Sequence, residues 1–136
     1  MVKEEYYKIL SILPFSKEYK KVNTILYLLK NNKLCETSLM KHLFAVDFYN
    51  CKENKEAITN LKYAHLPYGP VVDSRNALYN FLIKNDYIKI EINDVSTDFT
   101  TDKDFDKKLF TKEELNSLKT IKYNFKGYSA SELSDW

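Results

Sequence analysis

Apolar residues recur with helical spacing in the N-terminal part of the chain. Between residues 16 and 31 the lysines fall off a stripe of apolar side chains. The stripe consists of Tyr19, Val22, Ile25, Leu26, Leu28 and Leu29. This spacing predicts an amphipathic helix over residues 16–31. A shorter helix over about residues 3–13, ended by Pro14, is also expected.

The next segment predicts a second helix that is buried over much of its surface. Thr37 or Ser38 can cap its start, because a hydroxyl oxygen can accept a hydrogen bond from a free backbone N–H group. One face carries Leu39, Leu43 and Val46, and beside it lie Met40, Phe44 and Phe48. So wide an apolar surface is typical of a helix at the centre of a small domain.

Alternation of apolar and polar residues predicts two strands. Leu61 and Tyr63 alternate with polar neighbours, and residues 88–92 alternate isoleucine with polar side chains. Between them, residues 71–84 have helical spacing, ended by Asn85 and Asp86. We expect the two strands to pair with each other, with an antiparallel ribbon preferred to a parallel crossover.

The C-terminal third begins with residues 94–108, a polar and acidic stretch that is interpreted as an exposed loop. Thr111 and Glu114 then form a capping-box pattern ahead of an apolar stripe, and Gly127 suits the end of that helix. Ser129 and Glu132 repeat the pattern shortly before Trp136. The last helix starts so well and ends so soon that truncation is indicated.

These elements predict an α+β fold that is mainly helical, with about five or six helices around a small two-stranded sheet. The length of 136 residues fits one domain, and no linker or repeat divides it. The whole chain, residues 1–136, is therefore interpreted as a single domain, with residues 1–15 as an N-terminal extension.

Composition narrows the class of function. No apolar run is long enough to span a membrane and no signal peptide is present, so we expect a cytoplasmic protein with no membrane partner. The net charge is +2, and Arg75 is the only arginine. Dense basic surfaces and arginine forks are usual in duplex binding, so nucleic acid is not an expected partner.

Few residues suggest catalysis or metal binding. Asp102, Asp104, Asp106 and Glu113 have the spacing of calcium-loop ligands, but Lys107 stands where that loop requires glycine. The two histidines and two cysteines are scattered, without a nucleophile setting or a zinc-ligand spacing. We therefore predict no catalytic residues, no metal site and no cofactor, and interpret the protein as a non-enzyme.

Asp47 differs from the other acids because it lies on a helix that is predicted to be buried. It follows Phe44 by three residues and Leu43 by four, which places a carboxylate beside the apolar face of a buried helix. A carboxylate in that position needs a hydrogen-bond partner. We favour a structural hydrogen-bonding role over a catalytic one.

The segment LPYGPV, residues 66–71, is the least ordinary stretch of the chain. Its members are Leu66, Pro67, Tyr68, Gly69, Pro70 and Val71. Two prolines and a glycine predict a stiff corner between a strand and a helix, with Pro70 as the first helical residue. Held in this way, Tyr68 either serves as an anchor for a partner or packs inward.

Five segments in order resemble the Panacea-type, SocA-like antitoxin domains of bacteria and their phages. LMKHLFAVDF at residues 39–48 resembles the family pattern KLLYxADF, and EAITNLKY at 56–63 resembles xxITGxxY, with Asn60 where many relatives have glycine. LPYGPV follows at the family's spacing. YSASELS at residues 128–134 resembles LSAxELSxxxH, and the helix from Tyr19 to Lys30 resembles the opening NxILYL helix.

The resemblance implies an antitoxin that neutralises a toxin encoded by a neighbouring gene, through direct complex formation. One branch of the family delivers its toxin to a protease, so a proteolytic adaptor is an alternative. The resemblance implies that Asp47 and residues 66–71 belong to the motif and are candidate partner contacts. A homodimer is compatible with such a complex.

A second class of function is a winged-helix-like DNA-binding regulator. It is motivated by helices followed by a strand, a helix and a strand, and by Lys17, Lys20 and Lys21. The near-neutral net charge opposes this alternative.

Overall fold

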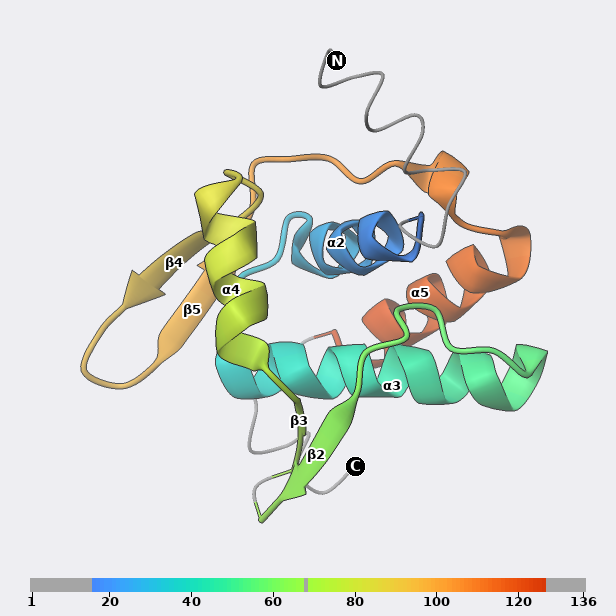
Figure 1. Ribbon diagram of the computed structural model, residues 1–136, viewed down its shortest axis with the longest axis horizontal. Helices are drawn as coiled ribbons and strands as arrows, with labels where there is room; N and C mark the ends of the chain where they lie inside the picture. The colour runs from blue at the N-terminus through green and yellow to red at the C-terminus, as the bar shows by residue number, and fades with distance from the viewer. Residues whose placement is uncertain (1–15, 68, 127–136) are drawn as a thin grey trace.

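Three helices form the centre of the molecule in a computed structural model, which describes residues 16–67 and 69–126 (Figure 1). They are α2 (Ser16–Leu29), α3 (Glu36–Asn54) and α5 (Lys112–Asn124). Both α2 and α5 pack against α3. The buried side chains between the helices are mostly aliphatic and include Ile25, Leu28, Leu43 and Leu118, each fully removed from solvent. Their burial is the main source of stability.

Two small antiparallel sheets flank the helices. One has the strand order β1-β5-β4, made from β1 (Leu34–Cys35), β4 (Lys89–Ile92) and β5 (Thr97–Thr100). The other is a hairpin of β2 (Tyr63–Leu66) and β3 (Gly69–Val72). Between β3 and β4 lies α4 (Arg75–Lys84), and η1 (Lys107–Leu109) is a short 3-10 helix before α5.

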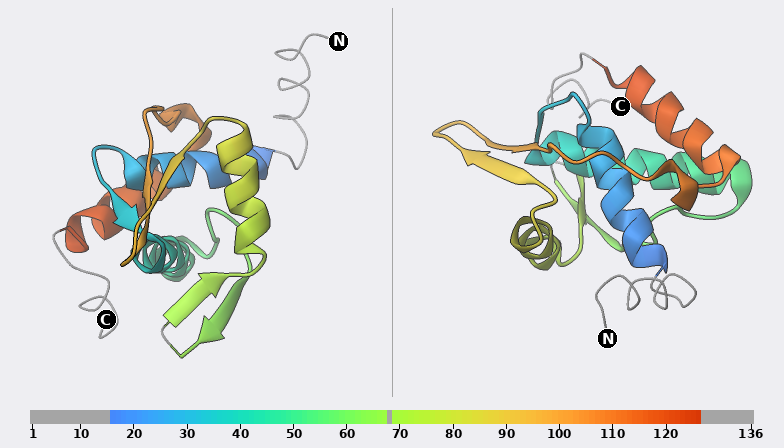
Figure 2. Two further views of the ribbon diagram at one scale, coloured as in Figure 1. Left: turned by 90° about the vertical axis from the view of Figure 1, so that its left-hand side faces the viewer. Right: turned by 90° about the horizontal axis from the view of Figure 1, so that it is seen from above.

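The two hairpins occupy different places around α3. The β2–β3 hairpin extends from the side of α3 remote from α2, whereas β4 and β5 project beyond α4 (Figure 1). The views from the side and from above show the same separation (Figure 2). The first hairpin packs against α3 mainly through β3, and the second packs against it through β5.

The α+β class is confirmed, and the order of strand, helix and strand is present. The described residues contain four α-helices, so the number of five or six is not confirmed. The short N-terminal helix and the helix after Ser129 lie outside the described residues. The helix predicted over residues 16–31 is confirmed as α2, and the capping box of Thr111 and Glu114 is confirmed at the start of α5.

The predicted strand pairing was wrong. The strands identified near residues 61–63 and 88–92 belong to different sheets, because each pairs with a strand that follows it closely in the chain. The partner of β4 is β5, which lies within the stretch interpreted as a loop. Phe99 in β5 is fully buried among polar sequence neighbours. One apolar residue in a four-residue strand is too weak a pattern to identify from periodicity.

Two helix starts also differ from the prediction. The N-cap of α3 is Cys35, with an extended backbone and no side-chain capping bond, instead of Thr37 or Ser38. The helix expected from residue 71 begins at Arg75, because residues 69–72 form β3. Short-range pairing with β2 thus takes precedence over the helix-start signal of Pro70.

Candidate functional site

Asp47 fixes the chain that follows α3. Its carboxylate is 6% exposed and accepts hydrogen bonds from the backbone N–H groups of Ile58 and Thr59, both at 2.9 Å. It also accepts from the Thr59 hydroxyl and, at 2.6 Å, from the Tyr63 hydroxyl. A buried carboxylate with this many donors has lost little of the stabilisation that water would provide. The link between α3 and β2 is therefore held rigidly.

Backbone geometry around Asp47 follows from the residue types. Lys55 ends α3 in the left-handed region at φ 69°, and Asn60 turns the chain again at φ 60°. Asparagine tolerates this region better than most residues do. The turn at residue 60 is thus made by an asparagine in the left-handed region.

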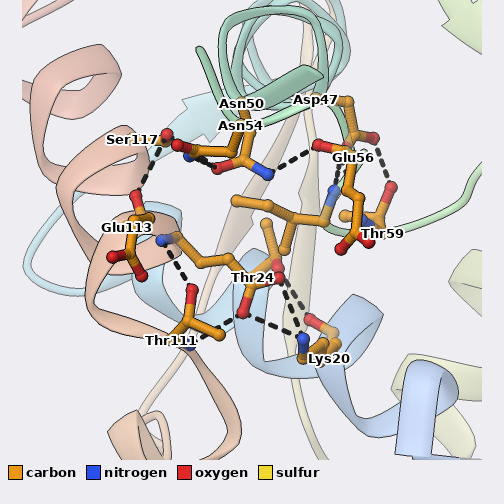
Figure 3. A network of polar contacts seen from close by, with 12 residues as sticks. Lys20, Thr24, Asp47, Asn50, Asn54, Glu56, Thr59, Thr111, Glu113 and Ser117 are labelled. Carbon is orange, nitrogen blue, oxygen red and sulfur yellow. Dashed lines mark hydrogen bonds and ion pairs between the residues drawn. The ribbon is translucent and has the colours of Figure 1, made fainter. Parts of the chain in front are cut away.

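A polar network inside the helical layer extends this support (Figure 3). Asn50 is 1% exposed and donates to the Glu56 carbonyl oxygen at 2.6 Å. Its side-chain oxygen accepts from Asn54 at 2.8 Å and from the Ser117 hydroxyl at 2.9 Å. Since these partners lie on α3, on α5 and in the loop after α3, the network joins the three segments.

The second part of the network joins α2 to the start of α5. The ammonium group of Lys20 lies 2.9 Å from both carboxylate oxygens of Glu114 (Figure 3). Glu114 is 6% exposed and also accepts from the Thr111 N–H group at 2.8 Å, completing the capping box. Polar side chains are therefore used here to position helices.

The LPYGPV segment forms a hairpin, and the prediction of a strand-to-helix corner was wrong. Leu66 and Gly69 are paired residues at its end. Pro70 lies inside β3 and pairs with His65, so it is not the first residue of a helix. Tyr68 lies outside the described residues, and both predictions for its side chain stay predictions.

Gly69 is required where the hairpin approaches α3. Its φ is +124°, which L side chains rarely adopt, and a Cβ added there would lie 3.0 Å from Cε of Lys41. Farther along β3, the Val72 N–H group donates to the Met40 sulfur at 3.2 Å. Val71 and Val72 are 4% and 1% exposed. The hairpin is thus seated on α3 by its second strand.

Side chains of α3 and of β2 together form an aromatic patch, which we define as Phe44, Phe48, Tyr63 and His65. Phe48 is 57% exposed and stacks on Phe44, with ring centroids 6.0 Å apart and planes at 20°. Phe44 meets Tyr63 edge-on at 5.4 Å and His65 at 6.1 Å. Both elements that carry the patch are braced by Asp47, so the rings have little freedom to rearrange.

Burial sets the protonation of two groups near this site. It raises the pKa of Tyr63, and the negative charge of Asp47 and the hydrogen bond to it raise that pKa further. Tyr63 therefore remains a hydroxyl donor to Asp47. Burial lowers the pKa of His42, which lies 2.7 Å from the Ser38 carbonyl through Nδ1. Neutral His42 can donate that bond from a protonated Nδ1.

The structure separates the residues of the calcium-like spacing. Asp102 pairs with Lys89, and Asp104 pairs with Lys30 at 2.8 Å. Asp106 instead caps η1 by accepting from the Lys108 N–H group at 3.0 Å. Within residues 16–67 and 69–126, no three His, Cys, Asp or Glu side chains are grouped so that they could hold a metal ion.

The aromatic patch was not predicted from sequence. Phe44 and Phe48 are four residues apart and were assigned to the buried side of the second helix. Hydrophobicity alone could not distinguish a buried ring from an exposed one. The hydrogen bonds from Thr59 and Tyr63 to Asp47 were not predicted either, although both residues lie in the segment 56–63 that resembles the family pattern.

Comparison with known sequences gives the family. The sequence model described as "Antitoxin SocA-like, Panacea domain" matches residues 39–136. The match begins at Leu39 in α3 and includes Asp47, the β2–β3 hairpin and the aromatic patch. No curated protein and no solved structure matches the chain. Because the match covers most of its length, the chain belongs to the SocA-like antitoxin family defined by the Panacea domain.

Proposed function

We propose that this protein neutralises a toxin encoded by a neighbouring gene by forming a direct complex with it, and that the aromatic patch and the β2–β3 hairpin contact the toxin. The family membership supports an antitoxin role. The observation that carries the choice of surface is Phe48, a large ring 57% exposed on a helix whose neighbours are fixed. Exposed aromatic side chains on a rigid frame are favourable interface anchors.

Rigidity matters because association lowers the freedom of every side chain that it immobilises. Phe44 and Tyr63 are already held by ring contacts and by Asp47, so little additional ordering is required on binding. Asp47 acts from beneath the surface in this proposal, since its carboxylate is occupied by four donors. Its motif role is then to position the partner contacts of the hairpin, including Leu66, Pro67, Gly69 and Pro70, while Val71 packs inward on α3.

The mechanism needs no catalytic step. Burial of the toxin's functional surface is sufficient, and the polar groups around the patch are used to hold α3, β2 and the intervening loop. Within the described residues, no helix has the length and apolarity needed to cross a membrane. The partner in this proposal is a protein.

Co-expression with the product of the adjacent gene tests this function. The wild-type protein should restore growth and co-purify with the toxin, and Phe48→Ser should weaken the complex by about tenfold or more while retaining the wild-type melting temperature. Val95→Ser, at a position 94% exposed on the other hairpin, is the matched control and should bind normally.

Two outcomes would contradict the proposal. Unchanged toxicity without complex formation would exclude direct neutralisation, and full binding by Phe48→Ser would exclude the aromatic patch. Toxin abundance in the same cells separates the two modes of action. Masking leaves toxin abundance unchanged, whereas an adaptor that delivers the toxin to a protease lowers it.

A further inference from the structure

A cavity of about 900 Å³ lies where the C-terminal ends of α2 and α5 meet the start of α3. Positively charged side chains outnumber negatively charged ones in its lining. The charged residues are Lys30, Lys33, Lys119, Lys122, Lys126 and Asp98. We refer to this site as the lysine cavity. It shares no lining residue with the aromatic patch.

Two of the five lysines are neutralised by acids of the β1-β5-β4 sheet and the following segment. Lys30 pairs with Asp104 at 2.8 Å. Lys33 lies 2.6 Å from Glu91 and 3.9 Å from Asp98. Asp98, the single acid of the lining, is therefore already engaged by Lys33, and the other two acids lie outside the lining. The remaining excess of positive charge therefore belongs to the three lysines at the end of α5.

Those three lysines line the cavity from the C-terminal part of α5 and the residues just beyond it. Lys119 and Lys122 are three residues apart, a spacing that places both on the same helical face. Lys126 follows two residues after the helix end. Lys119 and Lys126 are exposed, and neither forms an ion pair within residues 16–67 and 69–126.

Lys122 extends the positive charge into the cavity. Its ammonium group donates to the carbonyl oxygens of Tyr27 at 2.7 Å and Lys30 at 2.9 Å, and lies 4.9 Å from the centre of the Tyr27 ring. Burial and, to a smaller extent, the charge of Lys30 lower the pKa of Lys122. An anion beside this ammonium group would offset both effects.

The spacing of the charges favours an extended acidic peptide. Lys126 is seven positions after Lys119 and two beyond the last residue of α5, so the two lysines lie on the order of 10 Å apart along the direction of the helix. Three residues of an extended chain span about the same length. A single phosphate requires donors that converge on one point, and lysine lacks the planar fork with which arginine clamps phosphates.

Apolar surface in the cavity suits a peptide as well. Tyr123 lines the cavity and is 78% exposed, and Leu34 lies in the lining at the start of β1. An amphipathic ring next to separated cations can pack against the backbone and side chains of a bound segment, while the lysines pair with its acids.

We propose that the lysine cavity is a second partner-binding site, which receives an extended acidic segment of the toxin. That the occupant belongs to the toxin rests on the proposed antitoxin function. That the site binds an acidic peptide rests on the lining of the cavity alone. The acidic segment supplies charge complementarity and faster association, and the aromatic patch supplies most of the apolar contact.

A peptide experiment tests the cavity without the toxin. A fluorescent peptide with glutamate at every third position is titrated into the full chain, and the same peptide with glutamine serves as the uncharged probe. The glutamate peptide should bind about tenfold more tightly, and added salt should weaken it. The double variant Lys119→Glu/Lys126→Glu should weaken the affinity for the glutamate peptide by about tenfold or more and keep the wild-type melting temperature.

The control Lys84→Glu/Lys107→Glu makes the same change of net charge at exposed positions outside the cavity and should bind the peptide within about twofold of wild type. Equal binding by both double variants would overturn the proposal, as would equal binding of the two peptides. Tripolyphosphate and unlabelled glutamate peptide are then compared as competitors of the fluorescent peptide. If tripolyphosphate displaces it at the lower concentration, the site is assigned to phosphate instead.

The toxin complex then tests the occupant. If wild-type protein binds the toxin and Lys119→Glu/Lys126→Glu binds it equally well at low salt, the toxin does not use the lysine cavity. If wild-type protein binds the glutamate peptide but not the neighbouring toxin, the proposed function fails while the cavity stands as an acidic-peptide site. The two failures are therefore distinguishable.

Discussion

The β2–β3 and β4–β5 hairpins are alike in local structure but differ in how much of each is covered by other elements. Each pairs two antiparallel strands of four residues. In the first, Val71 and Val72 are buried against α3, whereas at the end of the second Ile92 and Val95 are 80% and 94% exposed. An apolar strand residue is thus buried only where another element covers it. The first hairpin has such a cover along β3, and the tip of the second does not (Figure 1).

The first hairpin is also the one that is anchored by buried polar contacts. Asp47 ties the approach to β2 to α3 through a buried carboxylate. The β4–β5 hairpin is tied at its tip by exposed Asn93, which accepts from the N–H groups of Val95 and Ser96 at 2.8 Å. Hydrogen bonds in water contribute less than those that satisfy buried groups. We therefore expect the two hairpins to respond very differently to matched substitutions.

The largest effect is expected from Asp47→Ala. It removes the acceptor of two backbone N–H groups and the hydroxyls of Thr59 and Tyr63, and should lower the free energy of unfolding by about 3–5 kcal/mol. Tyr63→Phe, which removes one donor, should cost about 1 kcal/mol. Urea unfolding measures both, and similar losses for the two variants would contradict a shared role of the carboxylate.

Val71→Ala should have the next largest effect. Val71 is 4% exposed, and removal of its buried methyl groups should lower the free energy of unfolding by about 2 kcal/mol. The same unfolding measurement applies. A loss below about 0.5 kcal/mol would mean that the hairpin does not depend on its contact with α3.

Gly69→Ala should destabilise the same hairpin by about 1–2 kcal/mol. The cause is its φ of +124°, together with the approach of a new Cβ to Cε of Lys41. Lys41→Ala in the Gly69→Ala background would separate these causes. If the double variant recovers the loss, crowding dominates; if it does not, backbone strain dominates.

Ile92→Ala should have the smallest effect, below about 0.5 kcal/mol, because the side chain is 80% exposed. It is the counterpart of Val71→Ala in the other hairpin. Thermal unfolding should give nearly the wild-type midpoint. A loss as large as that of Val71→Ala would show that burial does not explain the difference between the hairpins.

Local sequence patterns predicted those parts of the fold that depend on near neighbours. The helix predicted over residues 16–31 and the T-x-x-E capping box were identified correctly. The pairing of the strands was not, because β2 and β4 look alike in sequence and their partners were hidden in a proline-rich motif and in a polar stretch.

One feature near the candidate site was predicted and another was not. The position of Asp47 beside an apolar helical face predicted a hydrogen-bonded carboxylate, which is present, whereas LPYGPV predicted a strand-to-helix corner where the structure has a hairpin. The donors to Asp47 lie 11 to 16 residues away, in a loop whose path depends on the turn at Asn60. No local pattern encodes that path.

By itself, the sequence determined the helical periodicity, the chemistry of the turns and the family, because each depends on residue type and short spacing. Tertiary structure alone decided which aromatic rings are exposed, which hairpin is covered and where five lysines gather. The physical reason is that burial and electrostatic imbalance are properties of neighbours in space. Phe48 and Phe99 are chemically identical, yet one is 57% exposed and the other is fully buried, because different elements surround them.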